Sequence, residues 1–320
     1  MDQFKSFITE EKQDENYRLV IVSSKPEKNE YFHTTQRLLD EAKKLKIPAY
    51  ALMAESANIA DGQIWNSGDE KNKFDIDSEN TICIVRGSVA RRDAYLDLIS
   101  QLEKLGISVV NSRQTISICA DKYRSALRFA DTGVPTPKTA LVQSEETLQA
   151  SLDIIGEEYP MILKTAMGTR GVGVQFVESY KSLLTSLQLI LKIDEDIPLV
   201  LQEYIKTDYD VRAIVLNDEV VAQLKRPVIK GDFRSNISQG TLPEKMELTD
   251  LEIEQCLKAA KETEVMWGGF DFIPSKNRET EPPYFIEFNG SPGTGHLNEF
   301  NDINIYKLFI DIFKNRENWR

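Results

Sequence analysis

Two strands near the carboxyl end of the chain carry acidic residues where hydrophobic residues would be less costly. Residues 268–273 read GGFDFI and residues 284–289 read YFIEFN. If the two strands form a hairpin, Asp271 faces Glu287, and Asn289 follows roughly 7 Å along the same face. Carboxylates held this close repel each other and are costly to bury without a compensating cation. Three oxygen ligands without His or Cys favour a hard ion, Mg²⁺ or Mn²⁺, over zinc.

The opposite face of both strands is apolar. Alternation predicts that Phe270 and Phe272 pack on a core from one strand, and that Tyr284, Ile286 and Phe288 pack on it from the other. This pattern favours a central position in a sheet. The alternative interpretation of the acidic face is a solvated surface with carboxylates by chance, and these two strands alone leave both interpretations open.

A glycine-rich loop separates two further predicted strands. Residues 160–174 read PMILKTAMGTRGVGV, so Lys164 ends an apolar strand and Gly168, Gly171 and Gly173 follow it. Such a loop lets backbone N–H groups approach phosphate oxygens, with Lys164 as the charge partner. It is not a Walker A motif, because no Gly-Lys-Ser/Thr opens a helix, and it is not a dinucleotide fingerprint, because a second strand follows. The alternative is a glycine-rich turn without a ligand.

Two further signals are weak on their own. Lys122 lies near a predicted helix start, where the helix dipole favours an acid, and a lysine there is usually a surface residue. Residues 230–240 read KGDFRSNISQG, a segment rich in donors that includes Arg234, Ser235 and Asn236. A surface loop without a ligand would look the same.

Composition narrows the functional classes. The 320 residues carry a net charge of −12, which argues against non-specific binding to duplex nucleic acid. No apolar run reaches the roughly 18 to 20 residues of a membrane span, and the polar, acidic N-terminus is typical of neither a signal peptide nor a transit peptide. With two histidines, a His-based triad or a His-rich metal site is nearly excluded. Three scattered cysteines predict reduced thiols in a cytoplasmic protein.

The order of predicted elements divides the chain into parts. After a polar tail at residues 1–15, residues 16–113 alternate strands and helices, which predicts an α/β domain with a parallel sheet. Residues 114–197 begin with one helix that Gly133 stops and continue as an α+β unit with the glycine-rich loop. Residues 198–320 are mostly strands, with two helices among them.

Taken together and in this order, the signals resemble the ATP-grasp ligase fold, and within it the RimK-like branch, which joins amino acids to protein or peptide carboxyl ends. In chain order the signals are a lysine on a helix, a lysine before a glycine loop, an acidic QEY strand, the triplet Arg-Ser-Asn, and finally a strand with Asp and a strand with Glu-x-Asn. The segments GDFRSN and FIEFNGSPG are close to the signatures of this branch. The resemblance covers most of the chain and implies two α+β subdomains that close over ATP behind an N-terminal parallel-sheet domain.

Matched position by position, the resemblance implies roles for individual residues. The two lysines would contact the phosphates, the glycine loop would form a flexible lid, and the QEY strand would hold adenine and ribose. The implied nucleotide contacts are Lys122, Lys164, Gly168, Gly171, Gly173, Glu203, Tyr204, Asp210 and Ser235. The implied catalytic residues, at the acyl phosphate, are Arg234 and Asn236. The resemblance implies two Mg²⁺ ions, for which Mn²⁺ would be a substitute. Their implied ligands are Asp271, Glu287 and Asn289.

The reaction that the resemblance implies is an ATP-dependent ligation. A carboxylate is a poor electrophile, so ATP would convert it into an acyl phosphate, and an amine would then displace phosphate to form an amide. The expected partners are ATP, an amino acid and a carboxylate acceptor, foremost the carboxyl end of a peptide or protein. The alternatives are a small-molecule amino-acid or dipeptide ligase and, in another class, a nucleotide-binding module without turnover. No membrane or nucleic-acid partner is expected, whereas a homo-oligomer is typical of such relatives.

The chain departs from the pattern of the branch near the acceptor. ISQGT follows Arg-Ser-Asn where a basic, glycine-rich run is usual, Arg170 stands where glutamine is common, and SKNRETEPP lengthens the hairpin between the acidic strands. These changes are compatible with the ATP site and leave the acceptor unidentified. Arg86 and Arg91, in VRGSVARR, are candidates for holding an acceptor carboxylate, with a surface role as the alternative.

Overall fold

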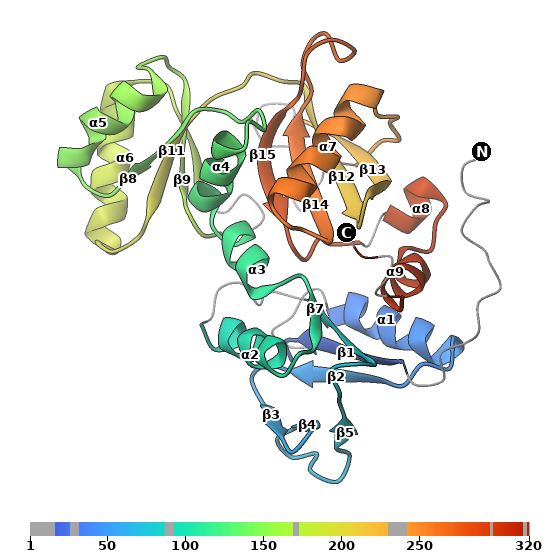
Figure 1. Cartoon of the computed structure of the whole chain (residues 1–320). Helices are drawn as coiled ribbons and strands as arrows, with labels where there is room; N and C mark the ends of the chain where they lie inside the picture. The colour runs from blue at the N-terminus through green and yellow to red at the C-terminus, as the bar shows by residue number, and fades with distance from the viewer. Residues whose placement is uncertain are drawn as a thin grey trace.

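Within the residues that the computed structural model describes, the strands form four sheets (Figure 1). The described residues are 17–25, 32–86, 93–168, 173–229, 242–294, 297–315 and 319. In the view of Figure 1 the N-terminal sheet lies below, and the two antiparallel sheets of the later chain lie side by side above it. No helix in these ranges is both long enough and apolar enough to cross a membrane.

The N-terminal sheet is parallel throughout, as the alternation of strands and helices predicts. In spatial order its strands are β2 (Ala49–Met53), β1 (Arg18–Ser23), β6 (Thr81–Val85) and β7 (Ser108–Val110). Helix α1 (Phe32–Lys44) covers one face through Leu38. Helix α2 (Asp93–Lys104) covers the other face through Leu102. Because both faces are covered, β1 and β6 are almost entirely buried and apolar.

A small antiparallel sheet lies between β2 and β6 in the chain, and we did not predict it from the sequence. Its strands are β3 (Ala57–Ala60), β4 (Gln63–Asn66) and β5 (Phe74–Asp75). The turn between β3 and β4 consists of Asp61 and Gly62, with φ of 51° and 72°. An Asp-Gly pair favours this two-residue turn, because both central residues need positive φ. The pair is therefore the signal in the sequence that predicts the hairpin.

The prediction of a single helix that ends at Gly133 is wrong, because the segment folds as two helices. These are α3 (Arg113–Cys119) and α4 (Lys122–Asp131). Asp121 between them adopts an extended backbone, and its carboxylate accepts hydrogen bonds from two backbone N–H groups in the first turn of α4. A side chain that caps a new helix ends the previous one. The break places Lys122 at the first position of α4.

The central sheet is antiparallel and carries the polar side chains of Lys164 and Gln202 on one face. In spatial order its strands are β10 (Val174–Val177), β9 (Met161–Thr165), β11 (Leu199–Glu203) and β8 (Thr139–Val142). Helices α5 (Glu145–Ile155) and α6 (Tyr180–Ile193) cover the other face, where Leu163 and Leu201 belong to the shared core. Since side chains alternate along a strand, Lys164 projects from the face opposite these helices.

The C-terminal sheet is also antiparallel and packs between two layers. In spatial order its strands are β13 (Glu219–Pro227), β12 (Tyr209–Leu216), β14 (Trp267–Ile273) and β15 (Tyr284–Asn289). Helix α7 (Asp250–Glu262) covers one face, together with Phe129 of α4. One end of the opposite face packs against helix α9 (Ile305–Phe313), which follows the short helix α8 (Leu297–Asn301).

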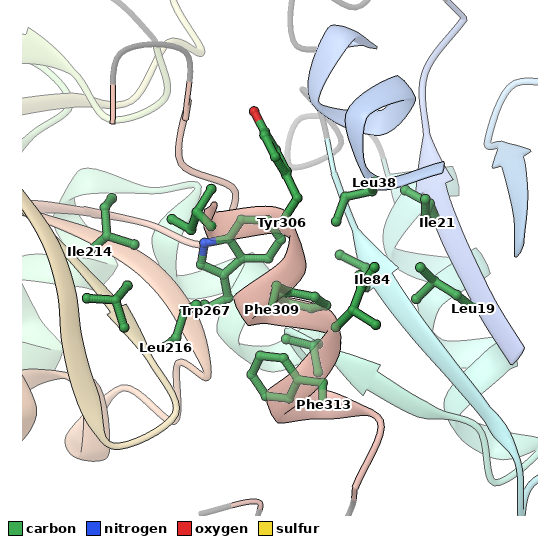
Figure 2. Packing of buried hydrophobic residues seen from close by; sticks show 14 of the residues in the cluster. Leu19, Ile21, Leu38, Ile84, Ile214, Leu216, Trp267, Tyr306, Phe309 and Phe313 are labelled. Carbon is green, nitrogen blue, oxygen red and sulfur yellow. The ribbon is translucent and has the colours of Figure 1, made fainter. Parts of the chain in front are cut away.

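An apolar cluster joins the C-terminal sheet to the N-terminal sheet (Figure 2). Trp267 of β14 and Phe309 of α9 lie between the two sheets, with their ring centroids 4.3 Å apart. Leu216 approaches from the C-terminal sheet, and Leu38 and Ile84 approach from the N-terminal side. The side chains of Trp267 and Phe309 are at most 1% exposed, so the cluster is a continuous core across both parts.

The prediction for β15 is partly wrong, because this strand lies at the edge of the described sheet while, of the two acidic strands, only β14 is central, and because its apolar face differs. Phe285 and Phe288 are fully buried, whereas Tyr284 is 39% exposed and Ile286 is half-buried. The register shifts between Asp271 and Phe272, which pair with Glu287 and Phe285, so Ile286 is an extra residue in β15. Such a β-bulge reverses the alternation on one side of it. The buried set therefore changes from every second residue to Phe285 and Phe288.

Replacing Phe309 by Ala tests the contact between the sheets. Removing a fully buried phenyl ring should lower the free energy of unfolding by about 3–5 kcal/mol. The matched control is Leu189→Ala on α6, whose side chain is 63% exposed and whose loss should change stability by less than about 0.5 kcal/mol. Urea denaturation followed by tryptophan fluorescence measures both. Equal midpoints for Phe309→Ala and Leu189→Ala would show that the cluster does not stabilise the chain.

Candidate active site

Lys164 projects from the face of the central sheet opposite α5 and α6 and is 7% exposed. Its Nζ donates a 2.8 Å hydrogen bond to Gln202 Oε1 on β11, and Gln202 Nε2 donates to Thr139 Oγ1 on β8. Burial, together with the charge of Lys122, lowers the pKa of Lys164 to about 8, and the charge of Glu287 opposes this shift. A buried ammonium held near a second lysine and a carboxylate of the other sheet is suited to an anionic ligand.

Lys122 lies beside the start of the glycine-rich loop. Its backbone N–H donates to the Ala166 carbonyl, and its Nζ donates to the Gly168 carbonyl, each at 2.9 Å. The first turn of α4 is therefore attached to the chain where it leaves β9. Lys122 and Lys164 therefore lie near each other at the start of the glycine-rich loop.

The far end of the glycine-rich loop depends on glycine. Gly173 has a φ of +76°, and a Cβ there would lie 3.0 Å from Thr165 Oγ1. Its carbonyl accepts a 3.1 Å hydrogen bond from the Thr165 N–H. Both the backbone conformation and the close approach exclude a side chain at this position. Gly171 lies outside the described residues, so its predicted role stays a prediction.

The two acidic strands pair as the sequence predicts. Asp271 of β14 lies directly opposite Glu287 of β15, and Asn289 lies opposite Gly269. The Nδ2 atom of Asn289 is buried and has no hydrogen-bond partner among the described residues. A Cβ at Gly269 would lie 2.9 Å from Pro292 Cβ, so the turn after β15 folds back closely onto β14.

A buried ion-pair network lies next to these strands, and two of its members are arginines that we did not predict. Arg212 Nε and Nη2 donate to Asp271 at 2.7 and 2.6 Å. Arg226 Nε and Nη2 donate to Asp210 at 2.6 and 2.8 Å, and Arg226 Nη2 is also 3.0 Å from Asp271. Burial alone would raise the pKa of Asp271, but the two arginines outweigh it and hold the pKa below its ordinary value.

Each of these arginines lies directly opposite an aspartate on a neighbouring strand. Asp210 pairs with Arg226 across β12 and β13, and Arg212 pairs with Asp271 across β12 and β14. Opposite charges at directly paired positions stabilise a sheet. These ion pairs can be recognised only when the register of β13, β12 and β14 is known, and the sequence alone does not give that register. Both oxygens of Asp210 accept bonds from Arg226, so its predicted nucleotide contact would share this network.

The predicted adenine–ribose residues lie at the end of β11. The backbone N–H of Glu203 donates to the Lys138 carbonyl at 2.9 Å, and Glu203 Oε2 accepts from the Lys138 N–H at 3.2 Å. The Tyr204 ring meets the edge of the Phe176 ring of β10, with centroids 5.0 Å apart. These contacts attach the segment to both edges of the central sheet.

Arg86 is fully buried, so the surface alternative for this residue is wrong. Its Nη2 donates a 2.6 Å hydrogen bond to the Pro292 carbonyl, and its guanidinium lies 4.3 Å from the centre of the Trp267 ring. Several other predicted positions lie outside the described residues. They are Arg91, Arg170, Arg234, Ser235 and Asn236.

The donor set of the acidic strands fits a hard divalent cation. Asp271 and Glu287 carry carboxylate oxygens and Asn289 carries an amide oxygen, which are the ligand types that Mg²⁺ prefers, although both Asp271 oxygens also accept hydrogen bonds from Arg212. The described part of the chain shows no group of three His, Cys, Asp or Glu side chains that could hold a metal. An ion here would therefore depend on the amide and on the phosphate oxygens of a nucleotide, as is usual for Mg²⁺.

Comparison with known proteins agrees with this geometry. Residues 119–313, more than half of the chain, match the model of the RimK-like ATP-grasp domain. A protein of Shewanella sp. (strain MR-4) named probable alpha-L-glutamate ligase 2 is 29% identical over 284 residues, covering 86% of this chain and 89% of that protein. A probable alpha-L-glutamate ligase of Marinobacter nauticus is 27% identical over 300 residues, covering 92% and 95%.

Solved structures share the fold at low sequence identity. The ATP-grasp ligase PsnB complexed with minimal precursor has a TM-score of 0.67 and 19% identity, covering 92% of this chain and 98% of that chain. D-alanine–D-alanine ligase from Bacillus anthracis complexed with ATP has a TM-score of 0.67 and 19% identity, covering 93% and 96%. The family match, the named relatives and the fold agree: the chain belongs to the RimK-like ATP-grasp family and is a carboxylate–amine ligase that forms a carbon–nitrogen bond.

Proposed function

We propose that this ligase activates a carboxylate with ATP and adds one or more amino acids to the carboxyl end of a peptide or protein. The observation that carries the proposal is the electrostatic environment of Lys164, a buried cation near both Lys122 and Glu287. Lys164 of the central sheet and Lys122 of α4 thus lie near Glu287 of the C-terminal sheet, as a phosphate–metal site needs. Relatives named alpha-L-glutamate ligase support an amino-acid substrate. PsnB, described as complexed with the precursor peptide PsnA2, supports a peptide acceptor.

The proposed chemistry has two displacements. A carboxylate oxygen attacks the γ-phosphorus of ATP, the bond to the β–γ bridging oxygen breaks, and ADP leaves. The amine nitrogen then attacks the acyl carbon, the bond to the phosphate oxygen breaks, and the nitrogen loses a proton. Phosphoryl transfer of this kind needs charge neutralisation and in-line positioning more than a nucleophilic side chain. That requirement matches a site of lysines, arginines and carboxylates.

The proposal assigns phosphate, metal and acyl-phosphate contacts to different parts of the chain. Lys122 and Lys164 neutralise phosphate charge at the glycine-rich loop. When bound, Mg²⁺ supplies further neutralisation of the phosphates. Two such ions, with Mn²⁺ as a substitute, would be held by Asp271, Glu287 and Asn289. The remaining proposed nucleotide contacts are Gly168, Gly171, Gly173, Glu203, Tyr204, Asp210 and Ser235. The proposed groups at the acyl phosphate are Arg234 and Asn236.

A small-molecule ligase is the second candidate. The fold is shared with D-alanine–D-alanine ligase and with the D-cycloserine synthetase DcsG, whose TM-score is 0.67 at 12% identity. An ADP-release screen across the standard amino acids, with and without cell lysate, separates the candidates when intact masses of the products are measured. A mass increase on a protein or peptide supports the first candidate, and a dipeptide product supports the second.

The cellular setting and the domain division are further parts of the proposal. Cys83, Cys119 and Cys256 are free thiols, which supports a reducing, cytoplasmic location. The proposed units are the tail 1–15 and the domains 16–113, 114–197 and 198–320. The N-terminal and C-terminal sheets support this division, because each lies within one of these domains. The central sheet does not, because its strand β11 falls in the third domain and pairs with β8 and β9 of the second.

Replacing Glu287 by Ala tests the metal assignment. Loss of a direct metal ligand should reduce Mg²⁺-dependent ADP release by at least about a hundredfold, since even outer partners of a metal contribute about 10- to 100-fold. The control is Glu279→Ala, an exposed acid on the same hairpin. A coupled ADP assay measures the rates, and circular dichroism checks the fold. Wild-type activity in a folded Glu287→Ala protein would refute the assignment.

Proton uptake on nucleotide binding tests the role of Lys164. Its pKa of about 8 leaves most of the free protein uncharged at this residue above that pH, and adjacent phosphates should raise the pKa again. Binding of ADP at about pH 9 should therefore take up a proton, whereas at about pH 6.5 it should not. Affinity should fall as the pH rises from about 8 through the higher pKa of the complex.

Calorimetry in two buffers of different ionisation enthalpy measures this uptake. Lys164→Arg, which stays charged at every pH used, is the matched variant and should show no uptake from this residue. Equal proton uptake by the wild-type protein and Lys164→Arg at about pH 9 would contradict the assigned role.

A further inference from the structure

Asn111, the residue after β7, binds both acidic strands at their ends. Its Nδ2 donates 2.7 Å hydrogen bonds to the carbonyls of Trp267 and Gly290. Its Oδ1 accepts from the backbone N–H groups of Met266 and Trp267, at 2.8 and 3.1 Å. The side chain is 1% exposed, and both donors and both acceptor sites of the amide are used. No other residue type of this size offers two donors and two acceptor sites.

Arg86, the residue after β6, holds the same turn two residues further on. Its Nη2 donates a 2.6 Å hydrogen bond to the Pro292 carbonyl, and its guanidinium lies over the Trp267 ring. Since β6 and β7 are neighbours in the parallel sheet, both side chains come from the carboxyl ends of adjacent strands. The residues that follow these two strands thus contact the turn 290–292 at two carbonyls. They also contact Trp267, the first residue of β14, through two hydrogen bonds and one guanidinium–ring contact.

The turn packs closely against its neighbours at two positions. A Cβ at Gly290 would lie 2.8 Å from Cys119 Sγ and 3.0 Å from the Cδ1 atom of Ile116, so the backbone lies directly on α3. On the other side, Pro292 lies against Gly269 of β14. Gly290 directly follows Asn289, so a displacement of this turn would be transmitted to the proposed metal ligand through a single peptide bond.

We propose that Asn111 and Arg86 are positioning residues for the metal site of this ligase. Through the carbonyls of Gly290 and Pro292 they set where Asn289 and Glu287 lie, so the N-terminal sheet controls the metal affinity of a site built on another sheet. Metal sites need ligands held within about 0.5 Å of the productive geometry, and losing an outer partner costs about 10- to 100-fold in affinity or activity. The inference rests on the proposed function, because it takes Glu287 and Asn289 as metal ligands.

The first test is Asn111→Asp, which keeps the acceptor oxygen and the size but removes both donors. The new carboxylate would face two carbonyl oxygens, so the turn must move away from β7. With saturating ADP, the Mn²⁺ dissociation constant measured by electron paramagnetic resonance should rise about tenfold or more. The Mg²⁺ concentration for half-maximal ADP release should rise in parallel, and excess Mg²⁺ should restore part of the rate.

Asn66→Asp in β4 is the matched control. Asn66 Oδ1 accepts from the Met53 N–H at 2.7 Å, and its Nδ2 donates to the Ala51 carbonyl at 2.9 Å, so the substitution breaks a similar amide bridge elsewhere in the N-terminal part. It should lower thermal stability without changing the Mn²⁺ dissociation constant. A parallel loss of Mn²⁺ affinity in both variants would reduce the effect to general destabilisation and overturn the inference.

Arg86→Lys is the second variant, and it decides the matter if Asn111→Asp does not fold. It keeps the positive charge but loses the planar group that stacks on Trp267, and Mn²⁺ affinity should fall again. Wild-type Mn²⁺ affinity in the folded variants would overturn the inference. If Glu287→Ala abolishes Mn²⁺ binding while Asn111→Asp and Arg86→Lys retain it, only this inference fails. If Glu287→Ala retains Mn²⁺ binding, the metal assignment in the proposed function fails.

Discussion

The packing of Trp267 against helix α9 determines where the acidic hairpin lies relative to the N-terminal sheet. Trp267 and Phe309 are almost completely buried in a cluster shared by both parts. A fully buried large side chain contributes about 1.5–3 kcal/mol, so this cluster offsets the desolvation of polar groups next to it. Asn111 is one of these polar groups. Its four hydrogen bonds compensate the desolvation of its amide, because every hydrogen-bonding position is satisfied.

Charge balance is the second constraint on the site. Two guanidiniums, Arg212 and Arg226, face two carboxylates, Asp210 and Asp271, so this network is neutral as a unit. Neutral networks with good geometry are tolerated in a buried position. Among the described residues neither Lys164 nor Glu287 has such a bidentate partner, and the proposed function assigns their charges to phosphates and metal. Burial and the nearby charge of Lys122 lower the pKa of Lys164, so an anion beside these two lysines would stabilise the charged form.

Several features of the site were predictable because they depend on local patterns. The pairing of Asp271 with Glu287 follows from the alternation in two strands joined as a hairpin, and the structure confirms it. The parallel N-terminal sheet follows from alternating strands and helices. The errors arose where a single residue overrides a pattern. Asp121 caps a new helix inside an apparently continuous one, and the extra residue Ile286 shifts the buried face of β15.

Residue types, strand periodicity and the order of motifs, all present in the sequence, determined the family of this protein and the chemistry of its candidate ligands. Only the tertiary structure decided which residues hold those ligands in place. Asn111 meets Trp267 and Gly290 across 156 and 179 residues of chain, and Arg86 meets Pro292 across 206. Contacts at such separations depend on how whole sheets pack, and sheet packing follows from buried area and shape rather than from any local pattern.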